Sequence, residues 1–346
     1  MLIELLINYG LAHSILSYCT PATIFKVGMT CHVLSEVVEG YVQFAFNIDR
    51  SLAVFFEDVH EFRRLQHRSG LLISGSFALQ FMGRLNYEGS DLDLFLPRHS
   101  RLEVALWLQT QGYVFAPSGM QGQSAHLETA LGGQEVGQHE HAYRLAGIFT
   151  VVTFRRRNVE GAPPTTIQLI IARSTPMELI LGFHSTCVMN VITYDTAYSL
   201  YPRATFEDMT SLVVLDNASQ KAPLAKYARR GWSLVRKPSV PDFNLDLSVR
   251  SMQDRRTWRL CLRGLTGEAP APYIHPAEVA TWKLQKTILG RMRIRPSVLS
   301  DRNRLFPIVV SDEPLLLFLR GALYGPNAHA VVQQTFWPSS QTEQSK

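Results

Sequence analysis

Residues 71–96 place the strongest constraint on how this chain folds. They read as an apolar strand, a Gly75-Ser76 step, a short helix and a second strand that carries Asp91 and Asp93. Side chains two positions apart on a strand point to the same face, so the two carboxylates share one face while the intervening leucines point to the other. The segment therefore predicts an acidic pair on a sheet whose opposite face lies in the core.

The chemistry of this segment suits a phosphate held beside a metal ion. Backbone N–H groups next to a hydroxyl, as at Gly75 and Ser76, suit a phosphate. Carboxylate oxygens, as at Asp91 and Asp93, are ligands that magnesium prefers, and this combination serves magnesium-assisted nucleotide chemistry. A bare Asp-Leu-Asp is more often a solvated strand end, and the preceding Gly-Ser step is what favours a site.

These residues resemble the nucleotidyltransferase superfamily that includes DNA polymerase beta. The family pattern is an apolar strand, Gly-Gly or Gly-Ser, a short helix and Asp-x-Asp or Asp-x-Glu, which here falls on Gly75, Ser76, Asp91 and Asp93. The interval between Ser76 and Asp91 is longer than is usual in that family. The resemblance covers residues 68–200. It implies that Asp91 and Asp93 are catalytic and hold magnesium, that Gly75 and Ser76 contact a nucleoside triphosphate, and that a nucleotidyl group is transferred to a hydroxyl.

The family also has a third carboxylate on a later strand, and here the chain departs from the pattern. The best candidate strand, Thr166–Ile171, carries Gln168 where an acid is expected. An amide carbonyl can contact a cation, but it carries no charge and cannot act as a general base. Loss of a general base typically removes about 10²–10⁴ of the rate, so we expect a degenerate or weakened site. Glu88, Asp195 and Asp208 are the candidate replacements.

Residues 1–60 predict amphipathic helices, part of which resembles an F-box. The matching positions are Ile15–Tyr18, Thr20-Pro21 as a helix start, and Thr30–Leu34. The F-box is a helical module that binds the adaptor subunit of cullin-RING ubiquitin ligases, so the resemblance implies that partner. The usual Leu-Pro entry is missing, and a helical cap packed on the α/β domain accounts for the same pattern.

Taken together, these segments resemble a large eukaryotic group that pairs an F-box-like region with a degenerate nucleotidyltransferase-like domain. Further matching stretches are Phe183–Asn190, Leu200–Pro202 and Lys226–Gly231. This combined resemblance supports the fold more than the function. It leaves a rival hypothesis open, in which the helices dock a ubiquitin ligase and an inactive α/β domain presents a substrate.

We therefore expect an α+β chain with three regions. Residues 1–60 form the helical F-box-like region, 61–215 a nucleotidyltransferase-like mixed sheet with flanking helices, and 216–346 an irregular helical part with a polar tail. Within the last region the apolar spacing predicts three helices, at Pro223–Arg230, Asp254–Leu262 and Pro276–Gly290. The Gly- and Gln-rich stretch 116–137 predicts a loop.

The charge pattern leaves nucleic acid open as a partner. The formal net charge is +5, and 27 of the 34 basic residues are Arg, whose planar fork suits phosphates. Arg155–Arg157 is the one tight basic run, and it suits a triphosphate or an RNA backbone, although a solvated strand end is the simpler explanation. Lys226, Arg229 and Arg230 either reach a nucleotide or complement the dipole of their helix.

Cysteine spacing and the N-terminal sequence indicate the compartment. The four cysteines lie far apart with no Cys-x-x-Cys pair, which argues against a zinc knuckle or a disulfide scaffold. The apolar N-terminus lacks the basic start of a signal peptide, and Glu4, Asn8 and His13 interrupt it. We expect a cytoplasmic or nuclear protein that is not secreted and has no membrane partner. His139–His141 offers metal ligands without a third, and His184 reads as a core histidine.

Overall fold

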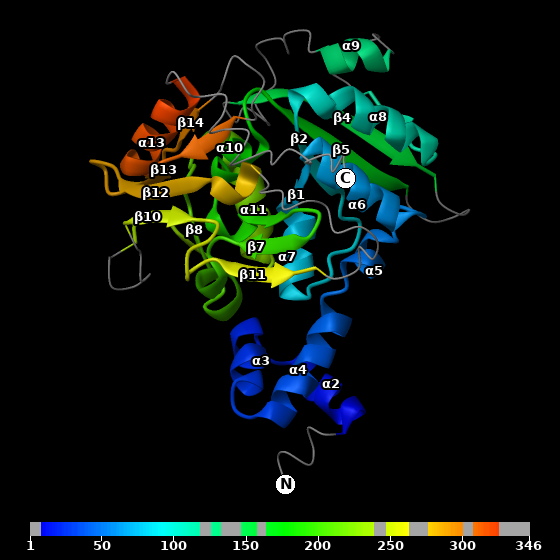
Figure 1. The fold of residues 1–346 in the computed structure, drawn as a ribbon, viewed down its shortest axis with the longest axis vertical. Helices are drawn as coiled ribbons and strands as arrows, with labels where there is room; N and C mark the ends of the chain where they lie inside the picture. Colours follow the sequence, from blue (N-terminus) through cyan, green and yellow to red (C-terminus); the bar gives the residue numbers. More distant parts are fainter. Residues whose placement is uncertain are drawn as a thin grey trace, which may run out of the picture.

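The computed structural model describes residues 8–117, 126–132, 147–157, 164–238, 247–262, 276–299 and 307–324. It shows a mixed α/β body built around one large sheet, from which a small group of helices projects (Figure 1). The coarse α/β expectation is thereby confirmed.

The helices alternate with strands through most of the chain. The helices are α2 (Tyr9–Ser17), α3 (Pro21–Gly28), α4 (His32–Ala45), α5 (Ile48–Leu52), α6 (Val59–Ser69), α7 (Gly75–Gly83), α8 (Arg101–Thr110), α9 (Leu127–Gly132), α10 (Pro176–Leu181), α11 (Lys221–Arg229) and α13 (Glu313–Tyr324). The strands are β1 (Leu72–Ser74), β2 (Leu92–Pro97), β3 (Val114–Phe115), β4 (Ile148–Arg156), β5 (Thr165–Ala172), β6 (Asn190–Ile192), β7 (Thr196–Ser199), β8 (Thr210–Leu212), β9 (Ser233–Val235), β10 (Val249–Ser251), β11 (Trp258–Cys261), β12 (Thr281–Lys286), β13 (Met292–Ile294), β14 (Ser297–Leu299) and β15 (Ile308–Val310).

The main sheet has eight strands in the order β11-β7-β6-β1-β2-β5-β4-β3. Its central pair is antiparallel, β1 against β2, and β2 then pairs with β5 in parallel. Side chains of β2 and β5 alternate between two hydrophobic cores, one on each face of the sheet. Leu92 and Leu94 belong to the core under α5–α8, whereas Phe95 and Ile170 belong to the core on the opposite face. The sheet is therefore the middle layer of the body.

Helices α2–α4 form a small unit that contacts the body through charged side chains at helix ends. Arg84, which follows α7, donates hydrogen bonds to the carbonyl oxygens of Leu16 (3.1 Å) and Cys19 near the end of α2. Glu207 accepts the Ala22 N–H (3.0 Å) and the Thr20 hydroxyl at the start of α3. A cation at a helix C-terminus and an anion at an N-terminus both complement the helix dipole, so these contacts fix the unit on the body.

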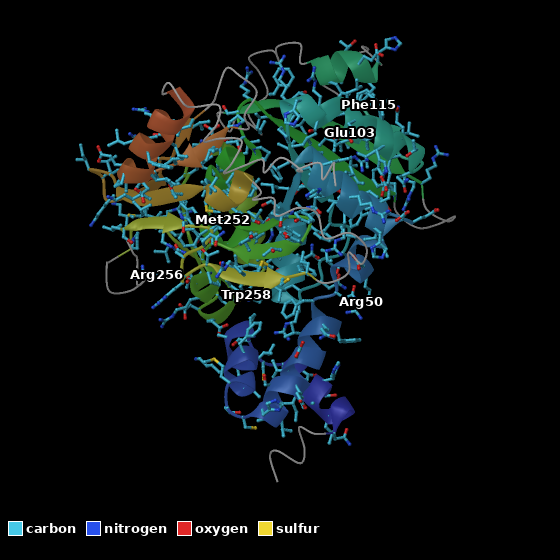
Figure 2. All side chains as sticks on the ribbon, in the orientation of Figure 1. Arg50, Glu103, Phe115, Met252, Arg256 and Trp258 are labelled. Carbon is cyan, nitrogen blue, oxygen red and sulfur yellow. The ribbon has the colours of Figure 1, made fainter. Side chains whose placement is uncertain are left out.

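An aromatic cluster lies at the same junction. Trp258 on β11 lies 5.9 Å from Phe25 of α3, 5.7 Å from Phe46 and 5.8 Å from Phe206, between ring centroids. Figure 2 labels Trp258 at the edge of the body that faces the projecting helices. The contact of α3 with the body is thus apolar as well as charged.

The predicted boundary at residue 60 falls within α6. The segment after Ala45 forms two helices, α5 and α6, whose residues Leu52, Phe62 and Leu65 are buried in the core of the body. Thr20 does cap α3, and Pro21 is its first residue, as the sequence predicts.

The C-terminal region corrects the expectation of an irregular helical part over 216–346. Helix α11 is present, but β11 lies in the second half of the predicted helix Asp254–Leu262, and the predicted helix Pro276–Gly290 is a short 3₁₀ turn followed by β12. The apolar residues that suggested a helix follow a period of two, because Trp282 and Leu284 are buried while the residues between and after them are not. Moreover, β11 pairs with β7, so this region completes one edge of the main sheet.

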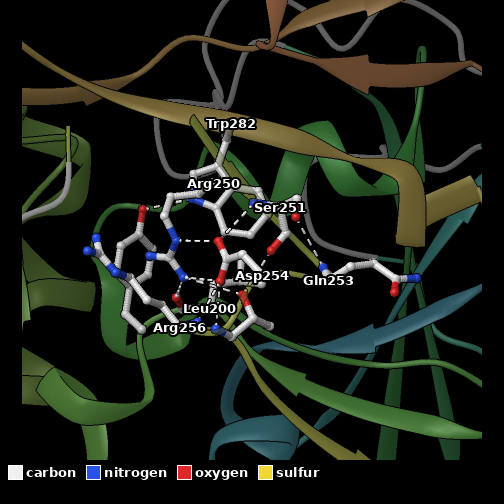
Figure 3. A network of polar contacts seen from close by, with 9 residues as sticks. Leu200, Arg250, Ser251, Gln253, Asp254, Arg256 and Trp282 are labelled. Atoms are coloured by element: carbon white, nitrogen blue, oxygen red, sulfur yellow. Dashed lines mark hydrogen bonds and ion pairs between the residues drawn. The ribbon is translucent and has the colours of Figure 1, made fainter. Parts of the chain in front are cut away.

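A buried arginine joins β10 to the main sheet (Figure 3). Arg250 donates to both carboxylate oxygens of Asp254 (2.6 and 3.2 Å) and to the carbonyl oxygen of Leu200 (3.0 Å). Its guanidinium lies near the rings of Tyr201 and Trp282. The charge is thus paired and its donors are used, as burial requires.

Other expectations meet the structure in part. The predicted loop 116–137 contains α9, and the rest of that loop from 118 onward lies outside the described residues, as do His139–His141 and the polar tail. Among the helices that the structure describes, none has the length and apolar character needed to cross a bilayer.

Candidate functional site

Three neighbouring strands bring the predicted site residues together. In the pairing register Asp93 of β2 lies opposite Ser74 of β1 on one side and opposite Gln168 of β5 on the other. Asp91 directly precedes β2. Because Phe95 and Ile170 share the opposite face from Leu92 and Leu94, the alternation places Asp93 and Gln168 on one face of the sheet. The structure thus positions Gln168 beside the acidic pair, where the sequence analysis placed it.

Gly75 makes the close approach of α7 to the acidic pair sterically feasible. Its φ is +69°, in the left-handed region, and a Cβ here would overlap Oδ2 of Asp93. The preceding residue, Ser74, donates its hydroxyl to the carbonyl oxygen of Asn190 (2.6 Å) and does not cap α7. The first N–H groups of α7, including that of buried Ser76, therefore begin beside Asp93 without a side-chain cap.

Gln168 and Thr166 both hydrogen-bond to Asp91. Nε2 of Gln168 donates to Oδ2 of Asp91 at 3.3 Å, and the Thr166 side chain also bonds to this carboxylate. An amide and a hydroxyl thus surround Asp91 on this side of the acidic pair.

The candidate replacement acids do not complete the pair. Asp195 accepts a hydrogen bond from the Thr193 hydroxyl (3.0 Å) in the turn after β6, beyond the opposite end of β1 from Ser74. Asp208 lies 3.7 Å from the guanidinium of exposed Arg203. Glu88 is exposed. Within the described ranges, no group of three or more His, Cys, Asp or Glu side chains is arranged to hold a metal ion.

Burial makes the acidic pair costly to ionise. Burial, with a further contribution from the neighbouring Asp91 charge, raises the pKa of Asp93 to about 7, and Lys226 partly offsets this. Burial also raises the pKa of Asp91, while Lys226 and Arg155 lower it. The pKa of Lys226 is itself lowered, by burial and by nearby Arg230, although both aspartates oppose that shift. The pair therefore favours the approach of additional positive charge.

Helix α11 and the loop after α7 place aromatic and basic side chains near the acidic pair. Tyr87, Lys226, Tyr227 and Arg230 form what we call the aromatic and basic wall. The Arg230 guanidinium lies 3.7 Å from the ring centroid of Tyr87 and 5.5 Å from that of Tyr227. Tyr87 is held by its N–H, which donates to Oε1 of Gln80 on α7 (2.6 Å). Considering the described residues alone, neither the buried Tyr87 Oη nor the buried Arg230 Nη1 has a hydrogen-bond partner. These two atoms retain hydrogen-bonding capacity for a ligand.

His184 packs behind this wall. Its Nδ1 lies 2.8 Å from the Ser185 hydroxyl, and its ring lies 5.6 Å from that of Tyr227. Burial, assisted by the Lys226 charge, lowers the pKa of His184 to about 4. The imidazole is therefore neutral at pH 7 and buried, as the reading of a core histidine expects.

The basic residues singled out in the sequence lie in different places in the structure. Lys226 and Arg155 influence the acidic pair, and Arg230 lies on the same wall as Lys226, since they are four residues apart at the end of α11. Arg156 instead lies over the ring of Tyr113 (4.8 Å). Sequence reasoning did not single out Thr166, Tyr87 or Tyr227 as site residues. For Thr166 the signal was available, because it precedes Gln168 by two positions on the same strand.

The chain was also compared with known proteins. No protein-family model, no curated protein and no solved structure matches it. The geometry of the site therefore has to carry any functional assignment.

The raised pKa of Asp93 gives a direct stability test. Because the folded pKa of about 7 exceeds the ordinary value of 3.8, ionising Asp93 opposes folding, and this cost grows as pH rises from about 4 to about 7. Without added metal, Asp93→Asn is expected to raise the free energy of unfolding by about 1–3 kcal/mol at pH 8, with the gain fading towards pH 4. Urea unfolding across this pH range measures it.

The matched control is Asp208→Asn, which removes an exposed carboxylate. It is expected to change the free energy of unfolding by less than about 0.5 kcal/mol at every pH. An Asp93→Asn effect that does not vary with pH would contradict the assignment of a buried, uncompensated charge.

Proposed function

We propose that the protein binds a nucleoside triphosphate with magnesium at Gly75, Ser76, Asp91 and Asp93, and that nucleotidyl transfer is weak because Gln168 replaces a general base. The observation that carries this proposal is the juxtaposition of Asp93, Gln168 and the left-handed Gly75 on adjacent strands at the start of α7. Carboxylates and a phosphate-binding helix start meet there at one point.

The charge of the acidic pair supports a cation as part of the ligand. The pKa values of Asp91 and Asp93 are both raised by burial, so a divalent cation would stabilise their ionised forms. The two carboxylates would hold it, and the amide oxygen of Gln168 would join them if the side chain rotates away from its bond to Asp91. Magnesium would supply charge neutralisation of the phosphates and polarise the reacting phosphorus.

The chain's own donors fit a polyphosphate beside that cation. The uncapped N-terminus of α7 offers backbone N–H groups and the favourable end of a helix dipole. Lys226 and Arg230 lie on the facing wall, and Nη1 of Arg230 is buried with an unused donor. Arginine pairs well with phosphate oxygens, so this wall suits the phosphate chain rather than a neutral ligand.

Transfer requires a step that this chain supports poorly. A hydroxyl would attack the α-phosphorus, its new P–O bond replacing the bond to pyrophosphate, and the hydroxyl proton would have to leave. Gln168 cannot accept that proton. His184 is neutral at pH 7, but its Nδ1 is engaged with Ser185 and the ring is buried, so it does not serve as a substitute base at this position.

Nucleotide binding is tested by removing the acidic pair. Asp91→Ala/Asp93→Ala is expected to weaken binding of a non-hydrolysable triphosphate in the presence of magnesium by at least about tenfold, and to abolish the dependence of binding on magnesium. Titration calorimetry with and without magnesium measures both effects. The matched control is Glu88→Ala/Asp208→Ala, which removes two exposed carboxylates and should leave the affinity unchanged. Equal affinity in wild type and the Asp91→Ala/Asp93→Ala variant would refute the binding site.

Restoring the third acid tests the degenerate active site separately. Gln168→Glu is expected to increase incorporation from labelled triphosphates on the order of 10²-fold, because it supplies a base and a metal ligand beside Asp91 and Asp93. Gln168→Met, of similar size and without either capacity, should give no increase. If Gln168→Glu binds nucleotide normally but gains no transfer activity, nucleotide binding stands and Gln168 is not the cause of the weak transfer.

A second function is favoured by the surface of the projecting helices. Helices α2–α4 expose large apolar side chains although the unit is small, namely Leu11, Ile15, Tyr18, Met29, Val33 and Phe44, with Tyr18 92% and Met29 85% exposed. Exposed apolar surface of this kind marks protein interaction sites. We propose as the alternative that this unit docks the adaptor subunit of a ubiquitin ligase.

Surface substitutions test this without removing the helices. Tyr18→Ser/Met29→Ser is expected to reduce capture of the purified adaptor subunit by at least about tenfold, because two exposed anchors are lost. Val54→Ser/Val114→Ser removes comparable exposed side chains from the body and should not change capture. Absence of capture by the wild-type chain would exclude this alternative while leaving nucleotide binding unaffected.

A further inference from the structure

The hairpin formed by β12 and β13 ends in a tight turn, far from the candidate site in sequence. The Thr287 N–H donates to the Arg291 carbonyl (2.7 Å), the Gly290 N–H donates to the Thr287 carbonyl (2.9 Å), and Gly290 has a φ of +74°. The turn is thus an ordered, hydrogen-bonded structure. Its two central residues are aliphatic. Ile288 is fully exposed and Leu289 is 73% exposed.

The base of this hairpin is firmly anchored. Leu284 of β12 and Met292 of β13 are buried together with Leu212 of β8, and Trp282 is fully buried in the larger core. Cross-strand pairing runs from Leu284 opposite Ile294 to Lys286 opposite Met292. In Figure 1 the hairpin lies at the outer left of the body, away from α2–α4. An anchored hairpin therefore presents an aliphatic tip to solvent.

All charged side chains of the segment that contains this hairpin are basic. Residues 281–299 contain five basic residues and no Asp or Glu, the basic ones being Lys283, Lys286, Arg291, Arg293 and Arg295. Four of them are exposed, all except Lys283. Asp216 lies 3.9 Å from Arg291 and 3.3 Å from Arg236, so this carboxylate is shared between two cations. These exposed cations are complementary to an anionic partner.

We propose that this hairpin docks the protein on an anionic lipid membrane surface, with Ile288 and Leu289 entering the acyl boundary and the basic residues lying at the headgroups. Apolar residues that insert between flanking cations are how peripheral segments bind such surfaces. The observations favour lipid over RNA, because bases are bound by stacking on aromatic side chains and the one aromatic residue in 281–299, Trp282, is buried.

A peripheral contact of this kind is compatible with the sequence features of the chain. The expectation of no membrane partner rested on the absence of a signal-like start and of a spanning segment. Neither bears on peripheral attachment by a two-residue tip and a cluster of cations, which needs no long apolar helix.

Vesicle co-sedimentation of the full chain tests the proposal. The wild type is expected to sediment with vesicles in which about a third of the lipid is phosphatidylserine, to remain in solution with phosphatidylcholine alone, and to be released by high salt. Ile288→Ser/Leu289→Ser should reduce the partition coefficient by about tenfold or more, and Lys286→Gln/Arg293→Gln/Arg295→Gln should do so as well.

Two matched controls make the outcome specific. Leu317→Ser/Phe318→Ser removes exposed apolar side chains from α13, and Lys26→Gln/Arg64→Gln/Lys221→Gln removes three exposed cations elsewhere. Both should bind vesicles within about twofold of wild type. The proposal is overturned if the wild type ignores anionic vesicles or if the tip variant binds as well as wild type. It is also overturned if the charge variant loses binding only to a labelled single-stranded RNA, which would assign the hairpin to nucleic acid.

Discussion

The packing of the Asp93 carboxylate against the bare Cα of Gly75 is the contact on which the candidate site depends. Any side chain at position 75 would collide with Oδ2 of Asp93, and the left-handed φ of Gly75 turns β1 directly into α7. Because β1 pairs with β2 and β2 with β5, this single turn sets the start of α7, the acidic pair and Gln168 within one small region. A glycine is required here for steric and conformational reasons at once.

Helix α7 connects that turn to the point where the projecting helices α2–α4 are attached. Its N-terminus lies at the acidic pair, and Arg84, directly after its C-terminus, binds the carbonyl oxygens at the end of α2. Only nine residues therefore separate the candidate nucleotide site from the attachment of the projecting helices. The two proposed functions, nucleotide binding and adaptor docking, are connected by a rigid helix rather than by a linker.

The sequence predicted the part of the fold that local patterns encode. The strand, Gly-Ser step, helix and acidic strand around Asp91 were readable because a period of two and a turn glycine both leave local signals. The same reasoning failed in the C-terminal region, where Trp282 and Leu284 were assigned to a helix, because a short apolar run is ambiguous until its pairing partner is known. Lys226 could be recognised as basic but not placed, since only the tertiary fold brings α11 against β2.

Charge balance shows what a neutral Gln168, rather than a third carboxylate, means for the proposed site. With Gln168 neutral, Lys226 lowers the pKa of both aspartates and Arg155 lowers that of Asp91, but burial still raises both pKa values, so one added cation would stabilise the ionised pair. A third carboxylate would make a second cation favourable, whereas the amide removes that driving force and keeps a hydrogen bond to Asp91. In the proposed function, the remaining basic groups would contact the phosphates. Such a site would favour binding a nucleotide over transferring a nucleotidyl group, because binding needs compensated charge while transfer also needs a proton acceptor.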